Sequence, residues 1–270
     1  MSSATESTIS VHIADKVAIL TLDRPQTLNA LTPSDYDKLS NSLREIDSRD
    51  DVLVTILQGN GQWFCSGTDV RSKKPTDDVK TGNLRETFRT SVTSTTIDVG
   101  QALYSHSKIL VAALNGPVMA FIGYFDFIYA LPGVWLSCPF TFIGIVAEGG
   151  ASVTFVNRMG VGMAKEVLIW GKKKNSQQLL DAGFINQIYP AQSTEEFHSA
   201  VRRDVLADLD GLDPTALLKM KSLIQVGLND KNNMDAVNLR EGYAQAARLA
   251  SGIPARQFRR IANKEIRHKL

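Results

Sequence analysis

Glu148 is the residue of this sequence best placed to do chemistry. It stands almost alone in a long apolar stretch, which begins with the strand candidate 109–114, passes through the break Asn115-Gly116-Pro117 and ends in Val-Ala-Glu-Gly-Gly. Burial raises the pKa of a carboxyl group, because the ionised form loses its hydration. We therefore expect Glu148 to transfer protons to or from a buried apolar substrate. The alternative interpretation is that Glu148 only caps the helix that follows, where an acidic side chain is favourable.

Other kinds of catalytic site have little support in the residues. The chain contains no GxGxxG, no GxxxxGK[ST] and no HExxH motif, and its four histidines are far apart. Dinucleotide, P-loop and zinc-protease sites are therefore not indicated, and we expect no metal. Cys65 would need a histidine base to act as a nucleophile, so a buried, inert thiol is the favoured interpretation.

Composition restricts the class of protein. The chain has 270 residues, of which 43% are hydrophobic and 21% charged, and its net charge is +2. Such values are typical of a globular domain and give no indication of nucleic-acid binding. The two cysteines form no CxxC pair, which favours a reducing compartment over a disulfide framework. The N-terminus is polar and acidic, and no apolar run is long enough to predict a membrane span.

Strands and helices alternate along the first part of the chain, and helices follow. Strands are expected at 9–14, 16–22, 52–57, 109–114, 125–130, 134–137 and 184–189. Helices are expected from Thr32 or Ser34 to Asp47, at 86–106, shortly after Pro117, after Gly150, and at 162–170, 176–182, 195–208, 214–227, 232–250 and 254–266. This order predicts an α/β fold with a C-terminal helical subdomain.

Three sequence segments together resemble the crotonase (enoyl-CoA hydratase/isomerase) superfamily. They are the run 64–69, Asn115-Gly116-Pro117 about fifty residues later, and Glu148-Gly149-Gly150, with Arg24-Pro25 and Leu28-Asn29-Ala30-Leu31 in support. The sequence is most similar to the Δ3,Δ2-enoyl-CoA isomerases of fungal peroxisomes. The resemblance implies a spiral of ββα turns over residues 1–195. It also implies a helical region, 196–270, that assembles the chain into a homotrimer or homohexamer.

The resemblance also implies an active site for acyl-CoA thioesters. Glu148 matches the base, and the backbone N–H groups of Thr68 and of Ala120 or Phe121 would bind the enolate oxygen, the latter at the start of a helix. No cofactor is implied, because CoA is part of the substrate. The residues expected to line the substrate and CoA path are Asn29, Ala30, Leu31, Ser66, Gly67, Thr68, Asp69, Val70, Asn115 and Gly116.

A single catalytic carboxylate favours isomerisation. Hydratases of the superfamily use two glutamates, and the segment after Pro117 offers no carboxylate before Asp126. Asp126 matches an acidic residue outside the active site. We therefore expect a 3-enoyl-CoA isomerase, of fatty-acid or secondary-metabolite metabolism, with two alternatives: a hydratase, or a catalytically silent acyl-CoA-binding or assembly protein. The silent alternative arises because 117–126 is about one helical turn shorter than the family pattern.

The C-terminus resembles a targeting signal. His268-Lys269-Leu270 is similar to the Ser-Lys-Leu tripeptide that a peroxisomal import receptor recognises. Together with the acyl-CoA chemistry, it predicts a location in the peroxisomal matrix.

Overall fold

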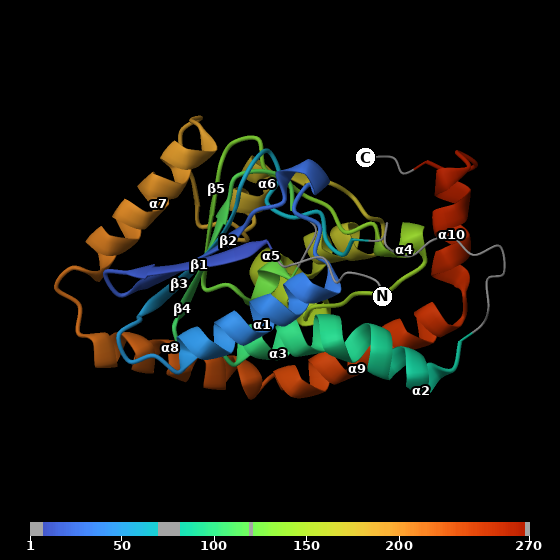
Figure 1. Cartoon of the computed structure of the whole chain (residues 1–270), viewed down its shortest axis with the longest axis horizontal. Coiled ribbons are helices and arrows are strands. Elements are labelled where there is room, and N and C mark those ends of the chain that lie inside the picture. Colours follow the sequence, from blue (N-terminus) through green and yellow to red (C-terminus); the bar gives the residue numbers. More distant parts are fainter. Residues whose placement is uncertain (1–7, 70–81, 119–120, 268–270) are drawn as a thin grey trace.

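A six-stranded sheet runs through the structure, a computed structural model that describes residues 8–69, 82–118 and 121–267 (Figure 1). The strands of this sheet, in spatial order, are β1 (Ile9–Ala14), β2 (Val17–Leu22), β3 (Val54–Gly59), β4 (Ile109–Leu114), β5 (Phe127–Ala130) and β8 (Gln187–Ile188). β1 and β2 form an antiparallel hairpin, and the later pairs are parallel. All six residues of β4 are buried, as expected for a parallel strand covered on both faces.

A second row of bridges shows that the chain winds as a spiral. Leu31 pairs with Thr68, Cys65 with Val118, and Val118 with Leu136, all in parallel. Leu31 follows β2, Cys65 and Thr68 follow β3, Val118 follows β4, and Leu136 follows β5. Each turn of the chain therefore adds one strand to the large sheet and one bridge beside it. The α/β spiral predicted from the sequence is therefore confirmed.

The helices α1 and α3 cover one side of the spiral near its first turns. α1 (Pro33–Asp47) begins with a capping box, in which Thr32 and Asp35 each accept a bond from the other's backbone N–H. The predicted helix at 86–106 is one helical stretch made of α2 (Leu84–Thr87), a π-helix η2 (Phe88–Ile97) and α3 (Asp98–Tyr104). Its weak sequence periodicity follows from the π-helical turns, which shift the side chains away from a 3.6-residue repeat.

The C-terminal helices lie where the sequence predicted them, within a few residues. They are α7 (Thr194–Leu209), α8 (Pro214–Asn229), α9 (Met234–Ala250) and α10 (Ile253–Ala262). In Figure 1, α8 and α9 run along the lower long side of the molecule, while α7 and α10 lie at opposite ends. α9 packs against η2, and the rings of Phe88 and Tyr243 stack with centroids 4.3 Å apart.

The middle of the chain holds the shorter elements. They are η1 (Pro25–Thr27), η3 (Ile122–Tyr124), β6 (Trp135–Leu136), α4 (Phe140–Ile143), α5 (Ala151–Leu168), β7 (Lys174–Asn175) and α6 (Ser176–Asp181). The two helices expected after Gly150 and at 162–170 are both present, because α5 consists of two helical segments that meet at the non-helical Gly160. This glycine has φ 75° and ψ 159°, a backbone conformation that is unfavourable for residues with a Cβ atom.

The short elements differ from the expectations. The last strand is only the two-residue β8 rather than 184–189, and β7, which pairs with β6, was not expected. The helix expected after Pro117 is, in the part described, a single 3₁₀ turn, η3. Two-residue strands and single turns depend on tertiary partners more than on local sequence, so no period marks them.

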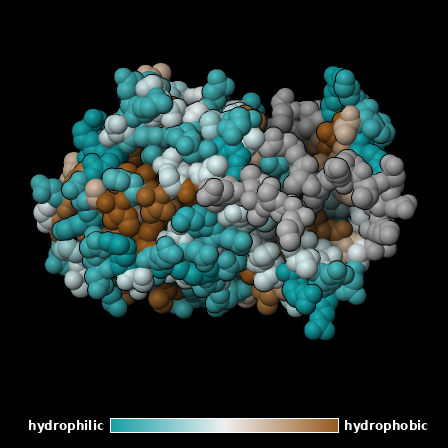
Figure 2. Space-filling view, viewed as in Figure 1, coloured by the Kyte–Doolittle hydropathy of each residue, from teal (hydrophilic) through white to brown (hydrophobic). Residues whose placement is uncertain are grey.

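The face viewed in Figure 2 is mainly hydrophilic. Its largest hydrophobic area lies in the left half, where the strands β1–β3 lie in Figure 1. Within the described residues, we find no helix with both the length and the apolarity needed to cross a membrane.

Candidate active site

One cavity brings together four residues that the sequence pointed to. Glu148, Gly67, Thr68 and Phe121 line a space of about 40 Å³, enough for a few water molecules. Its other lining residues come from α1, η2, α4, α5 and the loops between them, and they are Tyr36, Thr96, Cys138, Phe140, Gly149, Ala151 and Phe155. The ionisable side chains among these lining residues are those of Glu148, Tyr36 and Cys138. The cavity therefore suits an apolar acyl chain next to one carboxyl group.

The bridge to Leu31 determines where the N–H of Thr68 points. The N–H of Leu31 donates to the carbonyl of Gly67 at 2.8 Å, and the N–H of Asp69 donates to the carbonyl of Leu31 at 2.9 Å. In a parallel bridge of this kind, the amide groups of Thr68 itself face away from Leu31. Thr68 therefore aims its N–H to the opposite side, and it lines the cavity. This arrangement is suited to binding an oxyanion.

The segments 28–31 and 65–69 are held together, so the first motif supports the second. Ser66 donates its N–H to the carbonyl of Leu28, and the Cys65 thiol donates to the carbonyl of Asn29 at 3.2 Å. Gly67 has φ 89°, a left-handed conformation that glycine adopts at little cost. These contacts fix the turn that precedes Thr68.

Asn29 shapes this loop from inside. Its carboxamide accepts from the N–H of Arg24 at 2.8 Å and donates to the carbonyls of Asn60 and Trp63 at 2.9 and 2.8 Å. Only 2% of its surface is exposed. Asn29 therefore acts through the position of the loop, and any contact of Asn29, Ala30 and Leu31 with CoA would come from the backbone.

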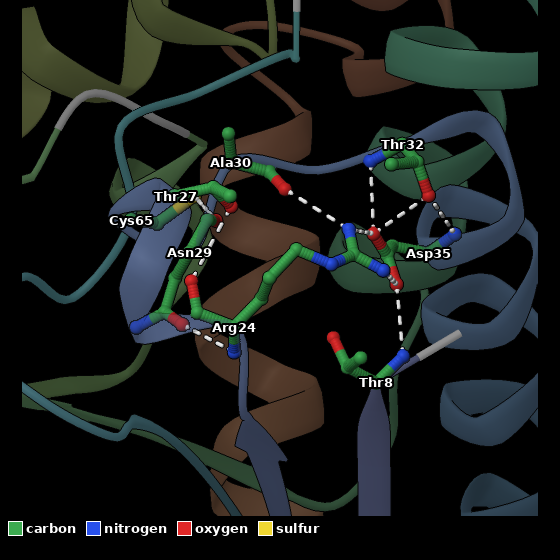
Figure 3. Close-up of polar contacts among 8 residues, drawn as sticks. All are labelled: Thr8, Arg24, Thr27, Asn29, Ala30, Thr32, Asp35 and Cys65. Atoms are coloured by element: carbon green, nitrogen blue, oxygen red, sulfur yellow. Dashed lines mark hydrogen bonds and ion pairs between the residues drawn. The ribbon is translucent and has the colours of Figure 1, made fainter. Parts of the chain in front are cut away.

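A buried ion pair anchors the same loop to α1 (Figure 3). A guanidinium nitrogen of Arg24 lies 2.5 Å from Asp35 Oδ2 and 3.4 Å from the carbonyl oxygen of Ala30. Asp35 also accepts from the N–H and the hydroxyl of Thr32, at 2.9 and 2.7 Å. Burial alone would raise the pKa of Asp35, but the Thr32 donors and Arg24 hold it below its ordinary value.

Glu148 is a carboxyl group with a strongly shifted pKa. Burial raises the pKa of Glu148 from 4.5 to about 7, a hydrogen bond from Gln245 opposes that rise, and the charge of Glu241 adds to it. The side chain is partly buried, and its open part faces the cavity. A carboxyl group with a pKa near neutrality can take up and return a proton with little cost in either direction.

Two hydroxyl groups and a thiol complete the polar surroundings of Glu148. Tyr36 and Thr68 form a hydrogen bond between their hydroxyl oxygens at 2.7 Å. Burial and then the charge of Glu148 raise the pKa of Tyr36, and the same two causes raise the pKa of Cys138 to about 12. Both groups are therefore neutral near pH 7, which leaves Glu148 as the group that exchanges protons.

Phe121 is the described candidate for a second oxyanion donor. It is 8% exposed, and a Cβ added to Gly149 would lie 3.1 Å from the Cβ of Phe121. Among the described residues, no acceptor is found for its backbone N–H. The helix dipole expected to assist this donor is reduced to that of the 3₁₀ turn η3. Ala120 lies outside the described residues.

Other residues of the predicted site lie around the cavity rather than in it. Asn115 donates from its amide to the carbonyl of Gly61 at 2.7 Å, and Gly116 packs so closely on Gln62 that an added Cβ would lie 1.9 Å from a carbonyl oxygen. Asn115 and Gly116 therefore position the chain. Asp126 pairs with Lys221 of α8 at 2.7 Å, outside the cavity as expected. Val70 and His268–Leu270 lie outside the described residues.

Cys65 is not a nucleophile candidate in the structure. Its thiol is fully buried and reduced, and burial raises the pKa of Cys65 to about 12. The interpretation as an inert thiol is confirmed. Within the described residues, no group of three or more histidine, cysteine or acidic side chains could hold a metal ion.

Three residues close to Glu148 could not be identified from sequence motifs. Tyr36 belongs to the buried face of α1, and no motif marks its hydroxyl as part of a site. Gln245 and Glu241 lie on α9, 89 to 99 positions after the residues near Glu148 that they contact. No local motif links such distant positions, and a glutamine in a predicted helix is usually read as an exposed residue.

The comparisons with known sequences agree with this geometry. A profile of the family described as enoyl-CoA hydratase/isomerase matches residues 12–242. The chain is 36% identical to a protein of Pyricularia oryzae named Delta(3,5)-Delta(2,4)-dienoyl-CoA isomerase, over 97% of this chain and 98% of that protein. It is 29% identical to the 3,2-trans-enoyl-CoA isomerase of Saccharomyces cerevisiae, over 97% and 96%.

Solved structures support the fold. An enoyl-CoA hydratase/isomerase from Pseudoalteromonas atlantica T6c superposes with a TM-score of 0.82 at 23% identity, covering 97% of this chain and 99% of that one. An enoyl-CoA hydratase from Bacillus halodurans does so with a TM-score of 0.77 at 17% identity, over 93% and 98%. The chain therefore belongs to the enoyl-CoA hydratase/isomerase family and has the crotonase fold.

Proposed function

We propose that this protein moves the double bond of a 3-enoyl-CoA to the 2-position, with Glu148 as the only base. The observation that carries the proposal is a single carboxyl group, with a pKa of about 7, in a mainly apolar cavity that is also lined by Thr68, whose N–H points away from Leu31. Glu148 takes a proton from C2, and the electrons form a dienolate whose negative charge rests on the thioester oxygen. Glu148 then returns a proton to C4, and the double bond becomes conjugated with the thioester.

That the chain is an isomerase of the crotonase family follows from its relatives. Two isomerases match nearly the whole chain at 36% and 29% identity. A hydratase would need a second acid or base to deliver water, and among the described cavity residues Glu148 is the one carboxylate. Proton transfer and enolate stabilisation require no cofactor in this scheme, because CoA enters with the substrate.

A second candidate reaction is the conversion of a 3,5-dienoyl-CoA to a 2,4-dienoyl-CoA. The relative at 36% identity carries that name and favours it. The reaction begins in the same way at C2 but delivers the proton at C6, which is farther from C2 than C4 is. One carboxyl group held in place by its neighbours suits the shorter transfer better.

Spectrophotometric assays with a trans-3-enoyl-CoA and a 3,5-dienoyl-CoA separate the candidates, because the products differ in conjugation. We expect the purified protein to turn over the 3-enoyl substrate with the higher kcat/KM. A higher value for the dienoyl substrate would replace the first proposal by the second. Hydration of a 2-enoyl-CoA would establish a hydratase, and acyl-CoA binding without turnover a silent protein.

Replacing Thr68 by proline is expected to lower kcat by about 10²- to 10³-fold, because proline lacks the N–H that would bind the enolate oxygen. Thr68→Ala is the matched control, since it keeps the N–H and removes only the hydroxyl bonded to Tyr36. Its kcat should stay within about tenfold of the wild type. Steady-state kinetics on both variants provide the comparison. Equal losses in the two would mean that the side chain of Thr68, and not its N–H, matters.

We also propose that the chain assembles into a homotrimer or homohexamer through its C-terminal helices. α8 supports this, because its large apolar side chains Met220, Leu223 and Ile224 are 56–60% exposed, an arrangement typical of interfaces. Sedimentation equilibrium should give the mass of three or six chains. A single-chain mass at micromolar concentration would contradict the proposal.

The proposed location is the peroxisomal matrix, and the protein would be imported by a receptor that binds His268-Lys269-Leu270. There it would act in fatty-acid or secondary-metabolite acyl-CoA metabolism. The similarity of this tripeptide to Ser-Lys-Leu supports the proposal. A fluorescent protein carrying the last ten residues should enter peroxisomes, and should not enter them when the tripeptide is removed.

A further inference from the structure

We propose that Gln245 of α9 is a positioning residue for Glu148: its amide binds one carboxylate oxygen and leaves the other for the substrate. The inference rests on the function proposed above. Gln245 donates from Nε2 to Glu148 Oε2 at 2.8 Å. Only 5% of the surface of Gln245 is exposed, so water does not compete for this amide.

The orientation of the Gln245 amide is determined by its second partner. The N–H of Val146 donates to Gln245 Oε1 at 3.3 Å. If the amide were reversed, its NH₂ group would face an N–H donor and its oxygen would face a carboxylate, and both contacts would be repulsive. A backbone group two residues before Glu148 therefore holds the NH₂ group toward Glu148.

The same face of α9 holds both ends of the segment that carries Glu148. Glu241, one turn before Gln245, accepts from the N–H groups of Gly150 and Ser152 at 2.8 and 2.9 Å. Arg248, three residues after Gln245, donates to the carbonyl of Gly144 at 2.9 Å. Residues spaced in this way lie on one side of a helix. α9 thus fixes the backbone on either side of Glu148, and Gln245 fixes its side chain.

Four groups, one on α1, one in the loop before α4 and two on α9, bear on the protonation of Glu148. Tyr36 from α1 and Cys138 from the loop before α4 are neutral, because their pKa values are raised. Glu241 from α9 raises the pKa of Glu148, and the Gln245 hydrogen bond lowers it. Gln245 is therefore the group that favours the ionised form, which is the form that accepts the C2 proton.

The test compares Gln245→Met, which keeps the length of the side chain without a donor, with the wild type. We expect kcat at pH 7 to fall about tenfold and KM to change less than about threefold. In the pH profile of kcat, the basic form of Glu148 should appear about one pH unit higher, because one hydrogen bond to the charged carboxylate is lost. Gln257→Met is the matched control. Gln257, on α10, donates to the carbonyl of Phe142 at 2.9 Å and does not bind Glu148. It should leave the pH profile unchanged.

A Gln245→Met enzyme with the kcat and pH profile of the wild type would overturn the proposal. So would a fall in kcat without a shifted profile, equal to that of Gln257→Met, because it would show only a looser segment. If the methionine variant does not fold, Gln245→Asn should shift the profile in the same direction, since its amide is withdrawn by one methylene.

Failure of the proposed function can be recognised separately. If the wild type binds acyl-CoA but isomerises neither substrate, the function fails while the hydrogen bond can still be tested. Infrared difference spectra of the wild type against Glu148→Gln isolate the titration of this carboxyl group. The same titration midpoint in the wild type and Gln245→Met would overturn the role of Gln245, and a higher midpoint in Gln245→Met would support it.

Discussion

Glu148→Gln is expected to lower kcat for a 3-enoyl-CoA by about 10³-fold, while acyl-CoA affinity changes little. An amide cannot take the proton from C2, and general acid–base catalysis contributes between 10²- and 10⁴-fold. The substitution should preserve the structure, because the carbonyl oxygen of a glutamine at 148 can still accept from Gln245. Steady-state kinetics and calorimetric titration with a non-reacting acyl-CoA measure the two effects.

Glu148→Asp is the informative control for this substitution. It keeps a carboxyl group but withdraws it from the substrate by one methylene, so activity should lie between the wild type and Glu148→Gln. The capping role considered for Glu148 is not found, because the N-cap of α5 is Gly150 and no side chain bonds to it there. If Glu148 takes no part in the reaction, the glutamine variant should retain nearly full activity. That result, or water addition that survives the substitution, would reject Glu148 as the base of an isomerisation.

Glu148→Gln should also be more stable than the wild type, and the difference in stability should increase as the pH rises. Below about pH 4.5 the Glu148 carboxyl is protonated in both the folded and the unfolded chain, and it does not lower the free energy of unfolding. Between 4.5 and about 7 the unfolded chain loses this proton first, so the stability of the folded state decreases with pH. Above about 7 the cost is complete, at up to about 3 kcal/mol, less where water in the cavity solvates the carboxylate.

Urea unfolding of the two proteins at about pH 5 and about pH 8 checks this effect. The gain in the free energy of unfolding for Glu148→Gln should be clearly larger at the higher pH. An equal gain at both values would mean that the pKa of Glu148 is close to its ordinary 4.5. The carboxyl group would then be a weaker base than the proposed reaction needs.

The sequence was sufficient for much of the fold because its strong patterns are local. Six consecutive apolar residues predicted the buried strand β4 with correct bounds, and of the two caps expected for α1, Thr32 and Ser34, Thr32 is the N-cap. The segment after Pro117 was predicted less well. A 3₁₀ turn between two strands of a spiral is set by what surrounds it, and here Gly149 and Thr154 lie against it from a later part of the chain.

The candidate site was predicted to the extent that its chemistry lies in short motifs. Glu148, Gly67 and Thr68 meet in one cavity, as the motifs indicated. Gln245 and Tyr36 could not be found in this way. Their roles follow from the packing of α9 and α1 on the spiral, and packing between distant segments leaves no trace in the spacing of a single sequence.

Arg24→Met is expected to destabilise the protein by about 3–5 kcal/mol, the largest effect on stability that we predict. Asp35 is 1% exposed, and removing the guanidinium leaves its charge buried without its cationic partner. The N–H of Thr8 and the two donors of Thr32 remain, but they compensate only part of the lost hydration. Chemical unfolding at neutral pH measures the loss.

Arg44→Met provides the matched control, since Arg44 pairs with Asp98 on the surface, where the two side chains are 42% and 40% exposed. Solvent and salt screen such a pair, so its loss should cost at most about 1 kcal/mol. The double variant Arg24→Met/Asp35→Asn should recover much of the stability lost in Arg24→Met, because it removes the uncompensated charge. Equal losses in Arg24→Met and Arg44→Met would contradict the buried-charge argument. If the argument holds, kcat should fall together with stability in Arg24→Met but not in Arg44→Met. Arg24 and Asp35 join the 28–31 loop to the helix that carries Tyr36, and this loop supports Thr68.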